Sequence, residues 1–407
     1  MDKCIMVGCD LHDQSLVLKI AQGTLPPATR RWANTVSGRQ AMIADLQHRA
    51  SQAGARIVFA YEASGSGFVL WDQLTAAGIE CHVLAPNRIE RSPRQRKNKC
   101  DDRDALLCLD KLRAHVLAGN ELPSVWVPPL QTRQDRDLVR HRLSVRMDAA
   151  DVKRQIRWLL KRNGVESSPA RGWTGEYWKW LEDLSAGQLP GGPGQALASM
   201  LRQLEFLLDE SGRLDKQVTA LCRERRYAGV VAALRRNKGV GVLTAMVFLT
   251  ELGDLSRFEN RRKLGNFLGL TPSAHGSGLN DDRKGRITHQ GPPRVRRVLC
   301  QAVWCRIGTL AAEQESYARL VARNPQHKKK AVVARMRVLA VRMWHDGLEA
   351  QRALAAEPQG DARLSHKATG RTRSRRPPQK PPVPYGPDAA LGSLASVALS
   401  SASAKTA

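Results

Sequence analysis

The sequence predicts an N-terminal α/β domain with a mixed sheet, followed by a mostly helical remainder. Residues 1–118 alternate short β-type apolar runs with segments of helical spacing. The segments between residues 131 and 346 are basic and mainly helical in their spacing. At 407 residues the chain is long enough for two or three domains, since domains usually hold about 100–200 residues.

The α/β domain begins with strands. Cys4–Cys9 and Leu16–Ala21 are short β-type runs, and the turn-prone stretch from Asp10 to Ser15 between them predicts a hairpin. Arg30–Thr35 is expected to supply a third strand. Helices and strands then alternate in the order Arg39–Ala53, Ile57–Tyr61, Phe68–Ala77 and Cys81–Ala85, before a final helix. This is the element order of the ribonuclease H-like fold, in which helices cover the faces of a mixed sheet.

The chain carries a strong positive charge. Its 65 Lys and Arg residues against 38 Asp and Glu residues give a formal net charge of +27, which attracts polyanions. Nucleic acid is therefore the expected partner. A membrane-surface protein would show a continuous apolar helix face or a lipidation motif, and the sequence has neither.

No membrane partner is expected. The longest apolar stretches, such as Val240 to Leu249, have about half of the roughly 20 residues that cross a bilayer. The N-terminus lacks the basic-then-apolar order of a signal peptide. The eight cysteines form no C-x-x-C pair, which favours reduced thiols. We expect a cytoplasmic protein that associates with the nucleoid.

Carboxylates gather where predicted strands end. Asp10 follows the first strand and Glu62 follows a later one, and the ends of neighbouring strands bring distant side chains into one crevice. Asp101 and Asp104 are three residues apart near the start of a probable helix, so they share a face. Four hard oxygen ligands suit Mg²⁺ or Mn²⁺, and two such ions can serve phosphoryl transfer. Asp102 would replace Asp101 if the register shifted by one residue, but its side chain and that of Asp104 lie on different faces.

The segment 131–165 is predicted to be a basic helix. Its cationic residues include Arg154, Arg157 and Lys161, which either form an ordinary solvated face or contact nucleic acid. The Gly/Pro-rich patch Gly187–Gly194 is predicted to be a loop. After it, four leucines with a 4-3-4 spacing predict a short seam that packs either within the chain or against another chain, namely Leu197, Leu201, Leu204 and Leu208. Ser211 and Asp215 are expected to interrupt that seam.

Two glycine-flanked segments stand out in the C-terminal half. Gly239-Val240-Gly241 lies between apolar helical segments and is similar to a helix-hairpin-helix turn, where backbone N–H groups approach a phosphate, although a purely structural turn fits equally well. Ser277 lies between Gly276 and Gly278, so its hydroxyl is accessible.

Taken together, these motifs resemble the transposases of the insertion-sequence 110/116/902 family. The resemblance rests on Gly8-x-Asp10-x-His12, on Glu62 after a strand, and on Lys99-x-Asp101-x-x-Asp104-Ala105. It continues through the following C-terminal motifs: Gly239-Val240-Gly241, Glu251-Leu252-Gly253-Asp254, Leu268-Gly269-Leu270-x-Pro272, Ser277-Gly278 and Gly285-Arg286-Ile287-Thr288. The sequence departs from the usual pattern at Asp13, Gly276, His289 and Pro292.

The resemblance implies a RuvC-like ribonuclease H fold with a D-E-D-D tetrad, made here of Asp10, Glu62, Asp101 and Asp104. It implies that Ser277 is the nucleophile, forming a phosphoserine link to DNA. Basic residues that would hold phosphates are Arg283, Lys284, Arg286, Arg294, Arg296 and Arg297. It also implies donor and target DNA as substrates, an element-encoded bridge RNA as guide, and a dimer or tetramer of this chain.

The predicted organisation has four parts: a RuvC-like domain over residues 1–125, a basic helical connector or coiled coil over 126–229, a mostly α serine transposase domain with a helix-hairpin-helix-like segment over 230–350, and a disordered basic, Pro- and Ser-rich tail over 351–407. Two other functions are compatible with part of these sequence features. The chain could be a metal-dependent junction resolvase or nuclease in which Ser277 is structural, or an inactive nucleic-acid-binding remnant.

Overall fold

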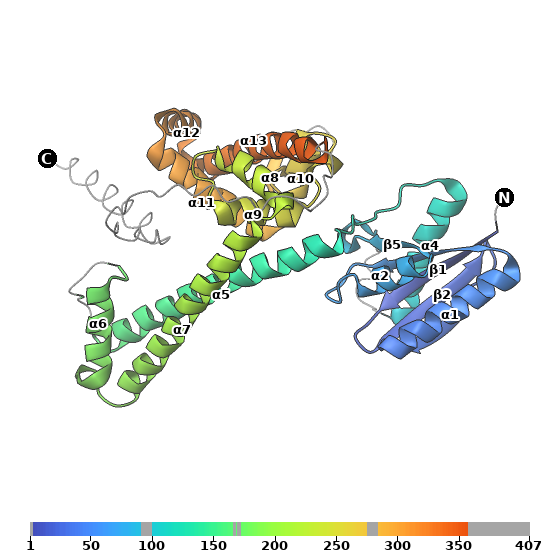
Figure 1. Cartoon of the computed structure of the whole chain (residues 1–407), viewed down its shortest axis with the longest axis horizontal. Helices are drawn as coiled ribbons and strands as arrows, with labels where there is room; N and C mark the ends of the chain where they lie inside the picture. Colours follow the sequence, from blue (N-terminus) through green and yellow to red (C-terminus); the bar gives the residue numbers. More distant parts are fainter. Residues whose placement is uncertain (1–2, 91–99, 166–167, 169–171, 275–283, 357–407) are drawn as a thin grey trace, which may run out of the picture. The chain divides into compact units, whose positions relative to one another are not determined.

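The computed structural model of the chain describes residues 3–90, 100–165, 168, 172–274 and 284–356 (Figure 1). The chain divides into two compact units, Met1–Pro129 and Leu130–Ala407. The four-part division expected from the sequence stays a prediction.

The first unit contains a five-stranded mixed sheet in the order β3-β2-β1-β4-β5. The elements follow one another as β1 (Cys4–Leu11), β2 (Ser15–Gln22), β3 (Ala28–Ala33), α1 (Val36–Ala53), β4 (Arg56–Glu62), α2 (Val69–Ala76), β5 (Glu80–Leu84) and α4 (Asp101–Ala118). The first three strands pair antiparallel, while β1, β4 and β5 run parallel. This arrangement is compatible with the expected ribonuclease H-like domain.

Helices cover both faces of this sheet (Figure 1). Side chains alternate between the two faces of a strand, so Val7 and Phe59 pack with Leu46 of α1 and Leu74 of α2. On the other face, the intervening residues of β1 and β4 pack against α4, where Leu109 is fully buried. In β1 and β4, odd-numbered residues therefore pack toward α1 and α2, and even-numbered residues pack toward α4.

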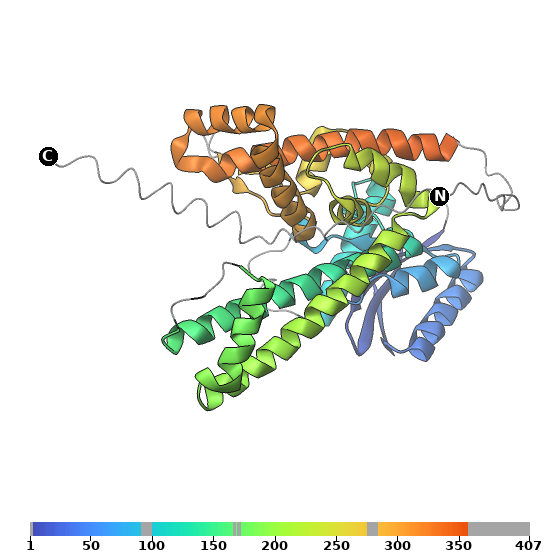
Figure 2. The same ribbon diagram turned by 60° about the vertical axis from the view of Figure 1, so that its left-hand side comes forward.

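The second unit begins with two long helices, α5 (Leu130–Arg162) and α7 (Gly192–Leu221), joined through α6 (Gly175–Asp183). The two long helices lie side by side in Figure 1 and Figure 2. Leu197, Leu201 and Leu204 of the predicted seam are buried in the same cluster as Val152 and Ile156 of α5. The seam thus packs within the chain.

Two expectations about α7 were wrong. The predicted interruption of the seam does not occur, because Ser211 is buried and Leu214 and Val218 extend the buried face. Asp215 lies at its edge, where Arg142 donates two hydrogen bonds of 2.8 Å to its carboxylate. The predicted loop Gly187–Gly194 is shorter than expected, since α7 begins at Gly192. Pro193 is tolerated in the first turn of a helix, where its missing N–H would have no intrahelical partner.

The remainder of the second unit is mainly helical. Its elements are α8 (Arg225–Arg235), α9 (Val242–Leu252), α10 (Arg261–Phe267), β6 (Pro272–Ala274), β7 (Lys284–Ile287), α11 (Pro293–Thr309), α12 (Ala311–Arg323) and α13 (Lys328–Ala356). The apolar stretch of α9 forms part of its core, in which Phe248 is fully buried. In the described part of the chain, no helix combines the length and apolar character needed to cross a membrane.

The predicted start of the disordered tail was too early. Helix α13 continues to Ala356, and the side chain of Gln351 accepts a hydrogen bond from the backbone N–H of Leu255. That contact gives the last turns of the helix a tertiary partner, which composition alone does not reveal. Residues 357–407 lie outside the described residues, so their predicted disorder stays a prediction.

A buried ionic cluster joins α11, α12 and α13. Glu313 is 8% exposed at its side chain and accepts hydrogen bonds from Arg306 at 2.5 Å and from Arg335 at 2.5 Å. Burial raises the pKa of the Glu313 carboxyl, but the hydrogen bonds from the two arginines outweigh it and hold the pKa below its usual value. Arg306 also donates to the carbonyl of Lys238, in the turn before α9.

We expect Glu313→Gln to destabilise the second unit by about 3 kcal/mol, because it leaves the buried guanidinium of Arg306 and the largely buried one of Arg335 without their carboxylate. The matched control is Glu315→Gln, an exposed position on the same helix. Since the folded pKa is depressed, the stability difference should be complete above the ordinary glutamate pKa and disappear as the pH falls through the folded value. Urea unfolding at several pH values measures this. Equal stability of both variants at neutral pH would contradict the assignment.

Candidate active site

Two carboxylates lie at the carboxyl ends of neighbouring parallel strands. The register pairs Cys9 of β1 with Tyr61 of β4, so Asp10 and Glu62 come next on the two strands. Both lie on the same sheet face as the even-numbered residues Met6 and Ala60, which pack against α4. Strand alternation and parallel register together bring these side chains to one edge of the sheet.

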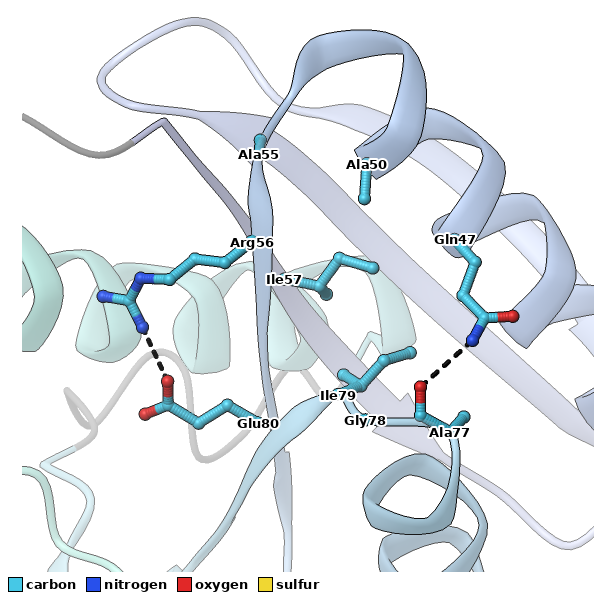
Figure 3. A pocket seen from close by; sticks show the side chains of 9 residues that line it. All are labelled: Gln47, Ala50, Ala55, Arg56, Ile57, Ala77, Gly78, Ile79 and Glu80. Carbon is cyan, nitrogen blue, oxygen red and sulfur yellow. Dashed lines mark hydrogen bonds and ion pairs between the residues drawn. The ribbon is translucent and has the colours of Figure 1, made fainter.

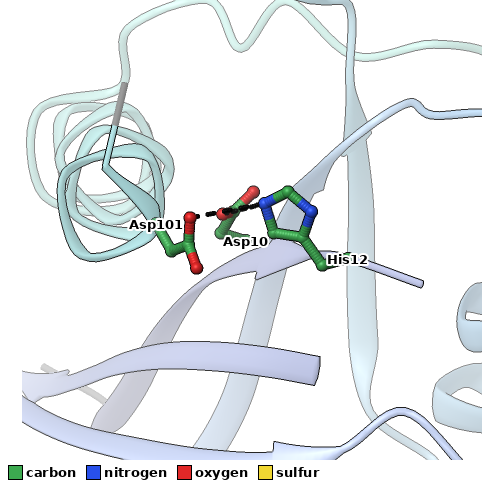
Figure 4. Close-up of side chains that lie close together, drawn as sticks. All are labelled: Asp10, His12 and Asp101. Atoms are coloured by element: carbon green, nitrogen blue, oxygen red, sulfur yellow. Dashed lines mark ion pairs between the residues drawn. The ribbon is translucent and has the colours of Figure 1, made fainter. Parts of the chain in front are cut away.

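Helix α4 supplies two further carboxylates at the same edge. It begins at Asp101, and both Asp101 and Asp104 lie in its first turn. Asp104, Asp10 and Glu62 line a pocket of about 400 Å³, together with His12 and the loop that follows β4. Figure 4 shows the carboxylate of Asp101, at the start of α4, pointing toward His12 Nε2. Three of the four predicted tetrad residues thus line one pocket, and the fourth, Asp101, lies beside it, 3.4 Å from His12 Nε2.

The mutual repulsion of these groups is visible at Asp10. Burial raises the pKa of its carboxyl, and the neighbouring charges of Asp104, Asp101 and Glu62 raise it further, whereas His12 opposes them. Asp10 Oδ2 is buried and has no hydrogen bond of good geometry among the described residues, although His12 Nε2 lies 3.2 Å from it. Neighbouring carboxylates that repel one another are stabilised by a divalent cation, so the residues present fit a hard metal ion.

Asp102 has a different environment. Its carboxylate lies 3.0 Å from Lys19 Nζ of β2 and 2.8 Å from Arg31 Nη2 of β3. The hydrogen bond from Lys19 is the main reason why the pKa of the Asp102 carboxyl is lowered, and Arg31 adds to it. Asp102 therefore already has two cationic partners, which gives it a structural role in joining α4 to the antiparallel side of the sheet.

The approach of α4 to β1 depends on Gly8. A Cβ atom at this position would overlap the backbone carbonyl oxygen of Ala105 and the backbone nitrogen of Leu109. The two backbones are therefore in direct contact. On the strand this contact lies two residues before Asp10, and on the helix it begins at Ala105, the residue after Asp104. The glycine of the Gly8-x-Asp10 motif thus allows the helix carboxylates to reach the strand carboxylates, a role that the sequence did not reveal.

A second pocket lies at the amino ends of β4 and β5, away from the acidic edge (Figure 3). It has a volume of about 390 Å³. Its polar groups are already paired, since Arg56 Nη1 lies 2.6 Å from Glu80 Oε2 and Gln47 Nε2 donates to the carbonyl of Ala77. The pocket offers no cluster of catalytic groups comparable to that around Asp10.

The predicted nucleic-acid contacts on α5 are exposed side chains, namely Arg154, Arg157 and Lys161. Arg154 lies 2.7 Å from Asp151 in a pair whose members are both more than half exposed, and such a pair contributes little to stability. Lys161 Nζ lies 5.4 Å from the centre of the Trp158 ring. These side chains are therefore accessible to a polyanion.

The predicted glycine turn connects α8 to α9. Gly239 has a φ of +85°, and a Cβ there would lie 2.7 Å from the carbonyl oxygen of Ala302 in α11. Gly241 is the N-cap of α9 and has open space around its Cα. Gly239 is thus required by packing, whereas Gly241 leaves room for a ligand to approach the backbone.

The cationic residues of the C-terminal motifs differ in their environments. Arg286 and Arg297 are exposed and Arg294 is half-buried. Arg296 has a structural role that the sequence did not reveal, because its Nη1 donates to the carbonyls of Leu268 and Gly291. Ser277 and Arg283 lie outside the described residues, as does the side chain of Lys284.

Comparison with known proteins matches both halves of the chain. The family model for the transposase IS116/IS110/IS902 family matches residues 231–319, and a transposase model of the DEDD IS110 type matches residues 7–163. The protein y4qE of Sinorhizobium fredii, a transposase by name, is 30% identical over 301 residues, which are 73% of this chain and 70% of that protein. The transposase for insertion sequence element IS1533 of Leptospira borgpetersenii is 25% identical over 306 residues, which are 75% and 86% of the two chains.

We expect Gly8→Ala to weaken Mn²⁺ binding at the acidic edge by about tenfold or more, because the added methyl group pushes α4 away from β1. Electron paramagnetic resonance of free Mn²⁺ during a titration measures the affinity. The control is Gly212→Ala on α7, where a Cβ meets nothing within 4 Å. Circular dichroism should show that both variants are folded. An unchanged Mn²⁺ affinity in folded Gly8→Ala would contradict the positioning role.

Proposed function

The chain belongs to the IS116/IS110/IS902 transposase family and is a DNA transposase, and from this premise we propose that it cleaves and rejoins the DNA strands of a mobile insertion sequence with two elements of chemistry. One is the acidic cluster of the first unit. The other is the hydroxyl of Ser277. The convergence of Asp10, Glu62 and the first turn of α4 on one pocket is the observation that carries this proposal.

Asp10, Glu62, Asp101 and Asp104 would hold Mg²⁺ or Mn²⁺. Their donors are all carboxylate oxygens, which these ions prefer. Repulsion from Asp104, Asp101 and Glu62 helps to raise the pKa of the Asp10 carboxyl, so binding a cation relieves an existing cost. When bound, such ions activate and neutralise the oxygens of a reacting phosphodiester. The carboxylates orient the scissile phosphate by fixing the position of that positive charge.

Ser277 would act on the phosphorus atom of the scissile phosphodiester. A bond forms between Ser277 Oγ and phosphorus while the bond from phosphorus to a deoxyribose oxygen breaks, and the proton of the hydroxyl passes overall to that departing oxygen. The resulting phosphoserine link conserves the energy of the phosphodiester for rejoining. Exposed Arg286 and Arg297 and half-buried Arg294 are suited to holding phosphates near this reaction.

The nucleic-acid partners would be donor DNA, target DNA and a bridge RNA encoded by the element. The net charge of +27 and the exposed cations Arg154, Arg157 and Lys161 on α5 support binding of polyanions in general. Gly241, at the start of α9, offers backbone N–H groups to a phosphate. RNA guidance and assembly of the chain into a dimer or tetramer follow from the family premise.

Whether Asp101 or Asp102 belongs to the tetrad can be tested directly. We expect Asp101→Asn to reduce strand transfer at least about a hundredfold, because it removes a metal-binding oxygen from the cluster. Asp102→Asn is the matched control one residue away, and it should keep most of the activity because Asp102 pairs with Lys19 and Arg31. Recombination of plasmid-borne element and target DNA measures both. The opposite result, with Asp102→Asn inactive and Asp101→Asn active, would assign the site to Asp102.

Ser277→Ala should eliminate the denaturant-resistant link between the protein and DNA, because no other oxygen replaces the nucleophile. Ser273→Ala is the control, since the Ser273 hydroxyl donates to the carbonyl of Arg286 across the β6–β7 pair and has a structural role. Gel electrophoresis of labelled DNA after denaturation detects the link. If cleavage continues without any adduct in the wild type, the chain is a metal-dependent nuclease. If neither reaction occurs, it is an inactive binding remnant.

A further inference from the structure

We propose that His12 is a nitrogen ligand of the metal ion at the acidic edge, so that the site combines carboxylate oxygens with one imidazole. This inference rests on the metal site of the proposed function and adds a donor of a different chemical class to it. A donor set that includes imidazole changes which ion is preferred, and it does so through a residue outside the tetrad.

The geometry around His12 carries the proposal (Figure 4). His12 Nε2 lies 3.2 Å from Asp10 Oδ2 and 3.4 Å from Asp101 Oδ1. One ligand atom from each of the three residues lies within 4.8 Å of the others. Adjacent ligands of an octahedral ion with bonds of about 2.1 Å are about 3.0 Å apart. The two nitrogen–oxygen separations are therefore within about 0.4 Å of the separation that one shared ion requires.

The backbone of His12 is fixed before any ion binds. Its N–H donates to the carbonyl of Ser15 across the β1–β2 turn, at 2.9 Å. Its carbonyl accepts a hydrogen bond of 2.6 Å from the Asn34 side chain, just before α1. The ring is 52% exposed, so an ion can reach it from solvent. A fixed backbone lowers the entropy cost of using the ring as a ligand.

A second role for the same ring makes the opposite prediction. If His12 only supplies positive charge to Asp10 and Asp101, it competes with the metal for their oxygens, and its removal raises the metal affinity. If it is a ligand, its removal lowers the affinity. Since Mg²⁺ prefers oxygen donors and accepts imidazole less readily than a transition ion does, the loss should also be larger for Mn²⁺ than for Mg²⁺. The sign of the change therefore separates the two roles.

The experiment compares the full chain with His12→Ala and His12→Gln. We expect Mn²⁺ affinity, measured by electron paramagnetic resonance, to fall about tenfold or more in both variants, and Mg²⁺ affinity, measured by competition, to fall less. Wild-type protein with bound Mn²⁺ should show electron spin-echo modulation from a coordinated nitrogen, and both variants should lose it. The matched control is His48→Ala, an exposed histidine of α1 bonded to Gln52, which should keep affinity and signal.

The outcomes separate this inference from the proposed function. Unchanged or increased Mn²⁺ affinity in the folded His12 variants, or Mn²⁺ bound to the wild type without nitrogen modulation, would overturn the role of His12 and leave the carboxylate site intact. Failure of the wild-type chain to bind Mn²⁺ at all would overturn both. Retention of the modulation in His12→Gln would show that the nitrogen belongs to another residue.

Discussion

Helix α4 lies directly against β1 at Gly8, and the acidic site depends on this contact. The strand turns Asp10 toward the helix, and the parallel register aligns Glu62 beside it. The helix begins close enough to present Asp101 and Asp104 at the same edge only because no side chain separates its backbone from the strand at Gly8. A tight backbone contact inside the core thus determines the spacing of groups at the surface, since close-packed interiors transmit small displacements.

The carboxylates of the first unit differ in how many cationic partners they have. Asp102 in the same helical turn is neutralised by Lys19 and Arg31, which tie α4 to β2 and β3. The Asp10 carboxyl gains His12 as a nearby partner, and burial together with its acidic neighbours still raises its pKa. Negative charges in the first turn also interact favourably with the N-terminus of a helix. The repulsion that remains at Asp10 is a local cost of the kind found at functional sites.

Sequence periodicity was sufficient to place the strands and helices of the first unit, because alternation and helical spacing are local properties. Periodicity could not show which distant residues pack against each buried helix face or bind each polar side chain. The seam at Leu197 packs within the chain, Arg296 binds backbone carbonyls, and Gln351 extends the last helix, and each of these depends on residues distant in sequence. For the same reason, the pattern included Gly8 and His12 without revealing what either one contacts.

Several residues of the C-terminal motifs have packing roles. Gly269 has a φ of +64°, and a Cβ there would overlap the backbone of Gln290, while a Cβ at Gly291 would overlap the carbonyl of Phe267. Two loops therefore pack backbone against backbone, and Arg296 bonds to a carbonyl in each. His289 adopts a φ of +54°, which histidine tolerates better than most side chains. These loops flank β6 and β7, so Gly269 of the Leu268-Gly269-Leu270 motif and Gly291 are required by packing, while the exposed Arg286 and Arg297 of the same region carry positive charge that packing does not use.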